Sequence, residues 1–168
     1  MLELDVRNLV KATAPVLKEQ GVALTRHFYA RMFKHNPELR ELFNQGHQRS
    51  GSQQEALAAA VAAYAENIDH PEVLMPVLEH IAAKHISLGI RAEHYAIVGR
   101  HLLASIAEVL SDAATPALIE AWAAAYGQLS DLLIGIEQQG YNEAATKAGG
   151  WTGWRSFKVR ARQPESAE

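Results

Sequence analysis

The sequence predicts an all-α fold, and three observations support this prediction. Apolar residues recur every three to four positions, alanine is abundant, and glycine and proline are sparse until the end of the chain. No segment before Trp151 shows the two-residue alternation of a strand. With 168 residues, of which 48% are hydrophobic, the chain can bury one core of ordinary size, which favours a single domain with a short appendage.

Turn and breaker residues divide the chain into helices. Breaks are expected at Gln20-Gly21, Asn36-Pro37, 45–52, His70-Pro71, Leu88-Gly89 and Thr115-Pro116. The first helix is expected to begin with Asp5 as its N-cap and to contain Pro15 as a local irregularity. The predicted helices cover residues 5–20, 21–35, a short segment from Pro37, 52–68, 73–86, 93–110 and 117–140.

The pattern changes after Gly149-Gly150. Phe157, Val159 and Ala161 alternate with basic residues, which predicts a strand. Because a lone strand is not stable, this segment is expected to begin a second, β-containing domain or to pack as an arm on the helices. A disordered basic tail is the alternative, since residues 164–166 have a disorder-prone composition.

Composition narrows the class of function. A net charge of −3 provides no field for nucleic acid or an anionic membrane, so small molecules or protein partners are favoured. The absence of cysteine excludes disulfides, thiolate metal sites and covalent attachment of a c-type heme. The N-terminal sequence is acidic where a signal peptide is basic, and no apolar run reaches the roughly 18 residues of a membrane span. We therefore expect a cytoplasmic protein.

His85 stands out among eight histidines, most of which are expected at the surface. It continues an apolar stripe formed by Val77 and Ile81, so its imidazole should project from the apolar face of its helix. A buried imidazole needs a partner. Position alone favours a hydrogen-bonded core histidine over a metal ligand, and both interpretations stay open at this point.

Glu137 lies on the core side of the last predicted helix. Its stripe is formed by Trp122, Tyr126, Leu129 and Leu133. An unpaired buried carboxylate is costly, so Glu137 either accepts strong hydrogen bonds or reaches water near the helix end. Tyr95 begins another core-facing stripe, and its hydroxyl also needs a partner. A tyrosine that donates to a carboxylate beside a histidine would satisfy all three groups.

A second polar set is expected on the other side of the core. Gln53 and Leu57 are one helical turn apart, and Tyr29 lies on an apolar helix. Together they are compatible with a polar pair over an apolar pocket. Taken singly, Tyr29 and Gln53 are typical of ordinary amphipathic helices.

Taken together, these residues resemble flavohemoglobins and the similar single-domain bacterial hemoglobins over nearly the whole chain. The resemblance is carried by HFYARMFKHNPELRELFNQ at 27–45, QQEAL at 53–57, AKH at 83–85, EHYAIVGRHLLASI at 93–106 and YNEAATKAGGW at 141–151. It implies a globin fold. In this family the last segment joins the globin to a flavin and nicotinamide reductase module. The sequence GGWTGWRSFKVRAR resembles the first strand of that module. We therefore expect a globin domain at 1–147 and a linker with the start of a reductase domain at 148–168.

The resemblance also assigns roles to individual residues. His85 would be the proximal ligand of heme b iron, with Tyr95 and Glu137 as its hydrogen-bonding network. Phe43 would pack on the heme, and Lys84 would pair with a heme propionate. The distal pocket would contain Tyr29, Gln53 and Leu57.

The activity that the resemblance implies is nitric oxide dioxygenation, in which dioxygen and nitric oxide give nitrate. Repeated turnover would require electrons from FAD and NAD(P)H through the missing reductase module or an external reductase. Two other classes stay open. One is a reversible oxygen-binding protein for storage, transport or sensing, and the other is a heme-free helical interaction module.

Overall fold

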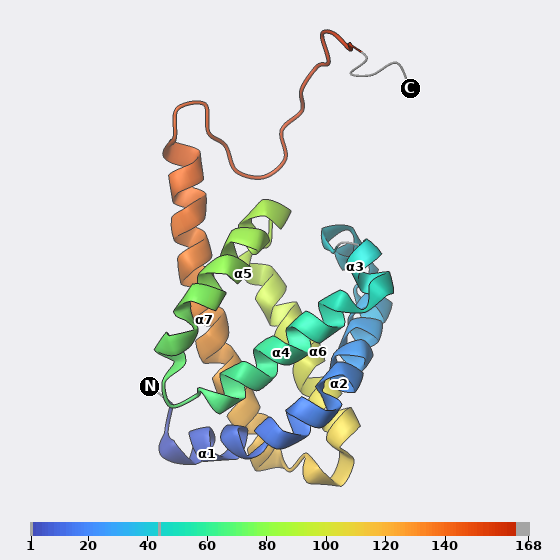
Figure 1. Ribbon diagram of the computed structural model, residues 1–168, viewed down its shortest axis with the longest axis vertical. Coiled ribbons are helices and arrows are strands. Elements are labelled where there is room, and N and C mark those ends of the chain that lie inside the picture. The colour runs from blue at the N-terminus through green and yellow to red at the C-terminus, as the bar shows by residue number, and fades with distance from the viewer. Residues whose placement is uncertain (1, 44, 164–168) are drawn as a thin grey trace.

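The computed structural model describes residues 2–43 and 45–163, and its regular elements are all helical (Figure 1). It therefore confirms the predicted all-α class. The elements are α1 Leu4–Ala12, α2 Ala14–His35, η1 Pro37–Leu42, α3 Gln45–Ser50, α4 Ser52–Glu66, η2 Pro71–Leu74, α5 Met75–Leu88, α6 Ala92–Leu110, η3 Ser111–Ala113 and α7 Pro116–Thr146. Helix α2 packs on α4 and α6, and α7 packs on α1, α5 and α6.

The buried apolar side chains form two clusters. The first joins α1, α2, α4, α6 and the first half of α7, and its most buried members include Phe28, Met32, Tyr64 and Ile106. The second joins α5, the start of α6 and the second half of α7. Burial of each large apolar side chain contributes roughly 1.5–3 kcal/mol. The two clusters hold α5 against α7 on one side of the molecule and α2 against α4 on the other.

The break between the first two helices is not where the sequence predicted it. Helix α1 ends at Ala12, and α2 already begins at Ala14, with Pro15 in its first turn, where proline removes no helical hydrogen bond. Gly21 lies inside α2 instead of ending a helix. A Cβ at Gly21 would stand 3.2 Å from the Cβ of Ala58 on α4. This glycine therefore permits a close approach of two helices.

The polar stretch 45–52 also differs from the prediction of a simple break. Residues Gln45–Ser50 form the short helix α3, and the chain turns at Gly51, whose φ of 83° suits glycine. The other expected breaks are confirmed. At Thr115, for example, the side chain caps α7 by accepting a hydrogen bond from the backbone N–H of Leu118 at 3.2 Å.

The C-terminal prediction needs correction. Helix α7 continues to Thr146, beyond the expected residue 140, and residues 154–163 contain no regular secondary structure. The strand predicted around Phe157 is not formed, because no neighbouring strand is available to pair with it. Trp154 and Val159 are 98% and 81% exposed, so this segment does not pack as an arm on the helices. Residues 164–166 lie outside the described residues, and the assignment of 148–168 to a second domain stays a prediction.

Among the described residues, no single helix has the length and apolar character of a membrane span. The bent pair Pro71–Leu88 and Ala92–Ala113, which meets at 114°, satisfies those criteria by length and composition alone.

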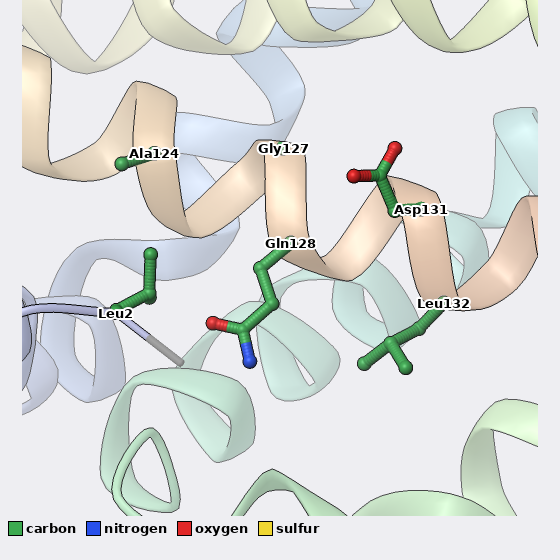
Figure 2. A pocket seen from close by; sticks show the side chains of 6 residues that line it. All are labelled: Leu2, Ala124, Gly127, Gln128, Asp131 and Leu132. Carbon is green, nitrogen blue, oxygen red and sulfur yellow. The ribbon is translucent and has the colours of Figure 1, made fainter.

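Two hollows on the surface lie away from the predicted site residues. One of about 540 Å³ lies where Leu2 approaches α7, and Figure 2 shows the side chains of Gln128 and Leu132 beside it. The other, of about 570 Å³, lies between Val16 on α2 and Leu110 on α6. Neither hollow is lined by a predicted site residue, and it is the hydrogen bonds of those residues that define the candidate site.

The close approach at Gly21 gives a first prediction. Gly21→Val should destabilise the chain by about 1–3 kcal/mol, because the added atoms must displace Ala58 or shift α4. The matched control is Gly135→Ala at an exposed position of α7, where a Cβ meets nothing within 4 Å. It should stabilise the chain by up to about 1 kcal/mol through helix propensity. Urea unfolding measures both, and equal stability of Gly21→Val and the parent would contradict the packing described.

Candidate functional site

Side chains from three helices meet at one carboxylate. His85 on α5 places Nδ1 2.7 Å from Oε1 of Glu137 on α7. Tyr95 on α6 donates its hydroxyl proton to the same oxygen at 2.5 Å. The His85 Nδ1 and Tyr95 Oη atoms are 3.1 Å apart, so the three groups form a triangle. The structure thus brings together the three residues that the sequence associated with each other.

The chemistry of this triangle determines which imidazole nitrogen carries the proton. An ionised carboxylate only accepts, so both Nδ1 of His85 and the hydroxyl of Tyr95 act as donors. In the neutral imidazole the proton is therefore on Nδ1, and Nε2 presents its lone pair. Glu137 is 2% exposed, and the two donors satisfy it. Burial raises the pKa of Tyr95 far above its usual range, and the Glu137 carboxylate raises it further.

Backbone contacts keep His85 and Tyr95 in place. Helix α5 ends at Leu88 and is capped by Gly89, whose φ of 74° lets the N–H of Ile90 turn back to the carbonyl oxygen of His85 at 3.0 Å. The hydroxyl of Tyr141 donates to the carbonyl oxygen of Ile90 at 2.6 Å, which attaches this turn to α7. The end of α5 is therefore fixed both by its own cap and by α7.

A second tyrosine of α7 supports Tyr95. The hydroxyl of Tyr126 donates to the carbonyl oxygen of Tyr95 at 2.7 Å. Its ring lies directly against Gly99, where a Cβ would be 2.5 Å from the ring carbon Cε1. Gly99 thus lets α6 approach α7 closely enough for this hydrogen bond to form.

The apolar face of α5 is turned from the direction that the sequence predicted. Leu78 and Ala82 are the buried residues of this helix, whereas Val77 is 53% exposed. The stripe of Val77, Ile81 and His85 therefore lies at the edge of the buried face, because α5 packs on α7 through the adjacent positions. His85 is consequently half-buried, with 29% of its side chain exposed.

The second polar set gathers around Tyr29 on α2. The Tyr29 ring lies 5.7 Å from the ring of Phe43 and 5.8 Å from that of Phe33, measured between centroids. Phe28 approaches it at 4.9 Å in an edge arrangement. Leu57 is partly buried against the same cluster. Three of the predicted residues, Tyr29, Phe43 and Leu57, therefore share one apolar environment.

Two carboxamides act on the hydroxyl of Tyr29. Burial raises the pKa of Tyr29 far above its usual range, and hydrogen-bonding interactions with Gln53 and Gln48 lower it by a smaller amount. Gln53 Oε1 and Gln48 Nε2 are buried, and neither reaches normal hydrogen-bond geometry with any described group. The Tyr29 hydroxyl stays protonated at neutral pH and lies among polar atoms that still lack a close partner.

The predicted residues form two sets that no described side-chain contact joins. His85, Tyr95 and Glu137 lie beside the second apolar cluster, and Tyr29 lies in the first. Figure 1 shows α5 and α3 on opposite sides of the upper part of the molecule. Lys84 is exposed on α5, next to His85 in sequence. The arrangement can offer one imidazole nitrogen from one side and a tyrosine hydroxyl from the other.

With this geometry described, comparison with known proteins identifies the family. Residues 26–133 match the sequence pattern of the globins. This chain belongs to the globin family. All 168 of its residues align with a flavohemoprotein of Bordetella parapertussis at 73% identity, and the alignment covers 42% of that relative. The chain thus spans less than half the length of this flavohemoprotein.

Two solved structures have the same fold. One is an engineered carbene transferase from Rhodothermus marinus, which carries a provisional assignment as a nitric oxide dioxygenase. It is 35% identical to this chain, with a TM-score of 0.81, and the match covers 86% of this globin and 99% of that chain. The flavohemoglobin of Malassezia yamatoensis, solved with bound FAD and heme, is 35% identical with a TM-score of 0.78. That match covers 84% of this globin and 38% of the other chain.

Sequence reasoning missed several residues that support the site. Tyr126 was expected to face the core, but its hydrogen bond to a backbone carbonyl has no sequence signal. Tyr141 was singled out only as part of a family segment. Gln48 lies in a polar stretch without helical periodicity, and Gln54 was singled out only as part of a family segment. Long-range contacts between amides and hydroxyls leave no pattern in a single sequence.

The shared carboxylate gives a second prediction. Tyr95→Phe should destabilise the chain by roughly 1–3 kcal/mol, because the buried Glu137 carboxylate loses a donor. The penalty should shrink when Glu137→Gln is already present, since a neutral amide costs less to leave underpaired. Urea unfolding of the single and double variants measures this coupling. Equal penalties in the two backgrounds would show that Tyr95 does not stabilise the carboxylate.

Proposed function

We propose that this globin binds heme b through His85 and converts nitric oxide and dioxygen to nitrate. The observation that carries the proposal is the His85–Glu137 hydrogen bond of 2.7 Å, which leaves Nε2 of His85 with a lone pair for a metal. Membership of the globin family and similarity to a flavohemoglobin solved with heme support it.

The residues present fit a heme. One imidazole nitrogen is too few to hold a bare metal ion, and a porphyrin brings four further nitrogens. The aromatic and apolar side chains around Tyr29, including Phe43 and Leu57, suit a flat apolar ring. Lys84 is exposed and so is free to meet a propionate in solvent. When bound, the heme supplies the iron at which dioxygen and nitric oxide are converted to nitrate.

The proximal residues would tune His85 as the ligand of the heme iron. Donation of the Nδ1 proton to Glu137 gives the imidazole partial imidazolate character and makes Nε2 a stronger electron donor. Tyr95 holds the carboxylate by its own hydrogen bond. This arrangement favours redox chemistry over simple oxygen storage, and it distinguishes the proposed enzyme from a carrier.

The distal residues would act on dioxygen from the side of the site away from His85. Because burial keeps Tyr29 protonated, its hydroxyl can donate to a partly anionic ligand, and the amide of Gln53 is available as a second donor. Phe43 and Leu57, which are partly buried against the first apolar cluster, would keep the surroundings of Tyr29 apolar. A ligand that receives these hydrogen bonds is released slowly.

Repeated turnover requires an electron donor. The flavohemoprotein of B. parapertussis extends far beyond the matched region, and the M. yamatoensis protein contains FAD. We propose that electrons reach this globin from NAD(P)H through an FAD-containing reductase, either as a further part of the protein or as a separate partner. Alone, the globin would complete one turnover.

Rapid mixing tests the activity. The oxygenated, heme-loaded chain mixed with nitric oxide should yield one nitrate per heme in a single turnover, measured by stopped-flow absorption and nitrate analysis. His85→Ala is the control and should yield none, because its pigment is lost or its coordination altered. Absence of stoichiometric nitrate, together with fast release of dioxygen, would instead identify a reversible oxygen carrier.

Resonance Raman spectroscopy tests the proximal network. Glu137→Gln should shift the ferrous iron–histidine stretching frequency downward, because a neutral amide withdraws less of the Nδ1 proton. The control is Glu143→Gln on an exposed position of the same helix, which should leave the band in place. An unchanged band in the Glu137 variant would mean that this carboxylate does not reach the imidazole in the heme-loaded protein.

A further inference from the structure

We propose that Tyr141, near the end of α7, is a positioning residue that sets how strongly His85 donates to the heme iron. The inference rests on the proposed function and assigns a role in it to a residue that the sequence singled out only as part of a family segment. Tyr141 acts on His85 through the backbone of Ile90.

A continuous series of hydrogen bonds connects Tyr141 to His85. The hydroxyl of Tyr141 donates to the carbonyl oxygen of Ile90 at 2.6 Å, and the N–H of Ile90 donates to the carbonyl oxygen of His85 at 3.0 Å. Ile90 belongs to the turn that follows α5, in which Gly89 adopts a φ of 74°. Because Ile90 takes part in both hydrogen bonds, a displacement of Tyr141 is passed to the backbone of His85.

Helix α7 holds the end of α5 at two points. Glu137 and Tyr141 are four residues apart, so they lie on one face of α7, one turn from each other. Glu137 accepts the hydrogen bond from the imidazole of His85 at 2.7 Å, and Tyr141 holds the turn that follows. One hydrogen bond alone would let the end of α5 pivot about it, whereas two fix its orientation. The direction in which the imidazole meets the carboxylate therefore depends on Tyr141.

Tyr141 is itself held in place. It is 7% exposed, and the guanidinium carbon of Arg91 lies 4.2 Å from the centroid of its ring, in a cation–π contact. Burial raises the pKa of Tyr141, so the hydroxyl keeps its proton at neutral pH and remains a donor. At the preceding residue, Gly140, a Cβ would be 2.4 Å from Cδ1 of Ile86 on α5. This glycine lets α5 lie close to α7 beside Tyr141.

The attachment affects the iron ligand through the hydrogen bond between His85 and Glu137. Donation of the Nδ1 proton to the carboxylate strengthens Nε2 as a ligand, and this hydrogen bond weakens when its length or direction departs from the ideal. Without the hydroxyl of Tyr141, the end of α5 can turn and carry the imidazole away from the carboxylate. His85 then becomes a weaker electron donor.

Removal of a single hydroxyl tests the inference. In the ferrous, heme-loaded chain, Tyr141→Phe should shift the iron–histidine stretching frequency downward, in the same direction as Glu137→Gln but by less. In the chain as purified, the amide proton of Ile90 should exchange roughly three- to tenfold faster, because the turn opens more easily after loss of one hydrogen bond. Resonance Raman spectroscopy and hydrogen exchange followed by NMR measure the two effects. An unchanged exchange rate would overturn the inference.

Tyr64→Phe is the matched control. The hydroxyl of Tyr64 on α4 donates to the carbonyl oxygen of Ala125 on α7 at 3.1 Å, and Tyr64 is 2% exposed. This variant also loses a hydrogen bond from a buried tyrosine to a backbone carbonyl, but away from the turn after α5. It should leave the iron–histidine band in place. A shift as large as that of Tyr141→Phe would show a general loosening of the fold and would overturn the inference.

A second variant is available if Tyr141→Phe does not fold. Arg91→Met keeps the hydroxyl of Tyr141 and removes the cation over its ring, so it should give a smaller downward shift. No shift with the variant that folds, in a chain where Glu137→Gln does shift the band, overturns this inference alone. Absence of an iron–histidine band from the parent chain overturns both the inference and the proposed function.

Discussion

The buried carboxylate of Glu137 is the constraint on which the rest of the site depends. At 2% exposure it cannot rely on water, so donors must come from other helices. The structure provides them as the imidazole of His85 and the hydroxyl of Tyr95. Satisfying one costly group therefore fixes the ring orientation, the tautomer and the free nitrogen of the histidine. A stability requirement and a functional geometry are met by the same two hydrogen bonds.

This arrangement requires unusually close helices, and glycine makes that closeness possible. At Gly99 a Cβ would collide with the ring of Tyr126, and at Gly140 it would lie 2.4 Å from Cδ1 of Ile86 on α5. Side chains at these positions would push α6 and α5 away from α7. His85 and Tyr95 could then no longer both reach the carboxylate. Glycines inside helices, which ordinarily weaken them, are here a condition for the hydrogen bonds between His85, Tyr95 and Glu137.

The sequence predicted the triangle of His85, Tyr95 and Glu137 because each of its members breaks an apolar stripe. Glu137 and Tyr95 occupy core-facing positions whose polar atoms need partners, and periodicity detects that conflict. Periodicity failed for Val77 because two adjacent stripes of α5 are equally apolar, and only packing against α7 selects between them. It failed for Gly21 because a glycine that ends a helix and one that admits a neighbouring helix look alike. Tyr29 is recognised only through family resemblance.

The two buried tyrosines of the site illustrate how environment assigns different tasks to one residue type. Burial raises the pKa of both Tyr95 and Tyr29, so both remain protonated. A carboxylate accepts the proton of Tyr95, which commits that hydroxyl to a structural hydrogen bond. Gln53 and Gln48 lower the pKa of Tyr29 by a smaller amount than burial raises it, and no carboxylate is among the groups that shift it. The charged acceptor beside Tyr95, which Tyr29 lacks, is therefore the difference on which the proposed role of Tyr29 toward a ligand depends.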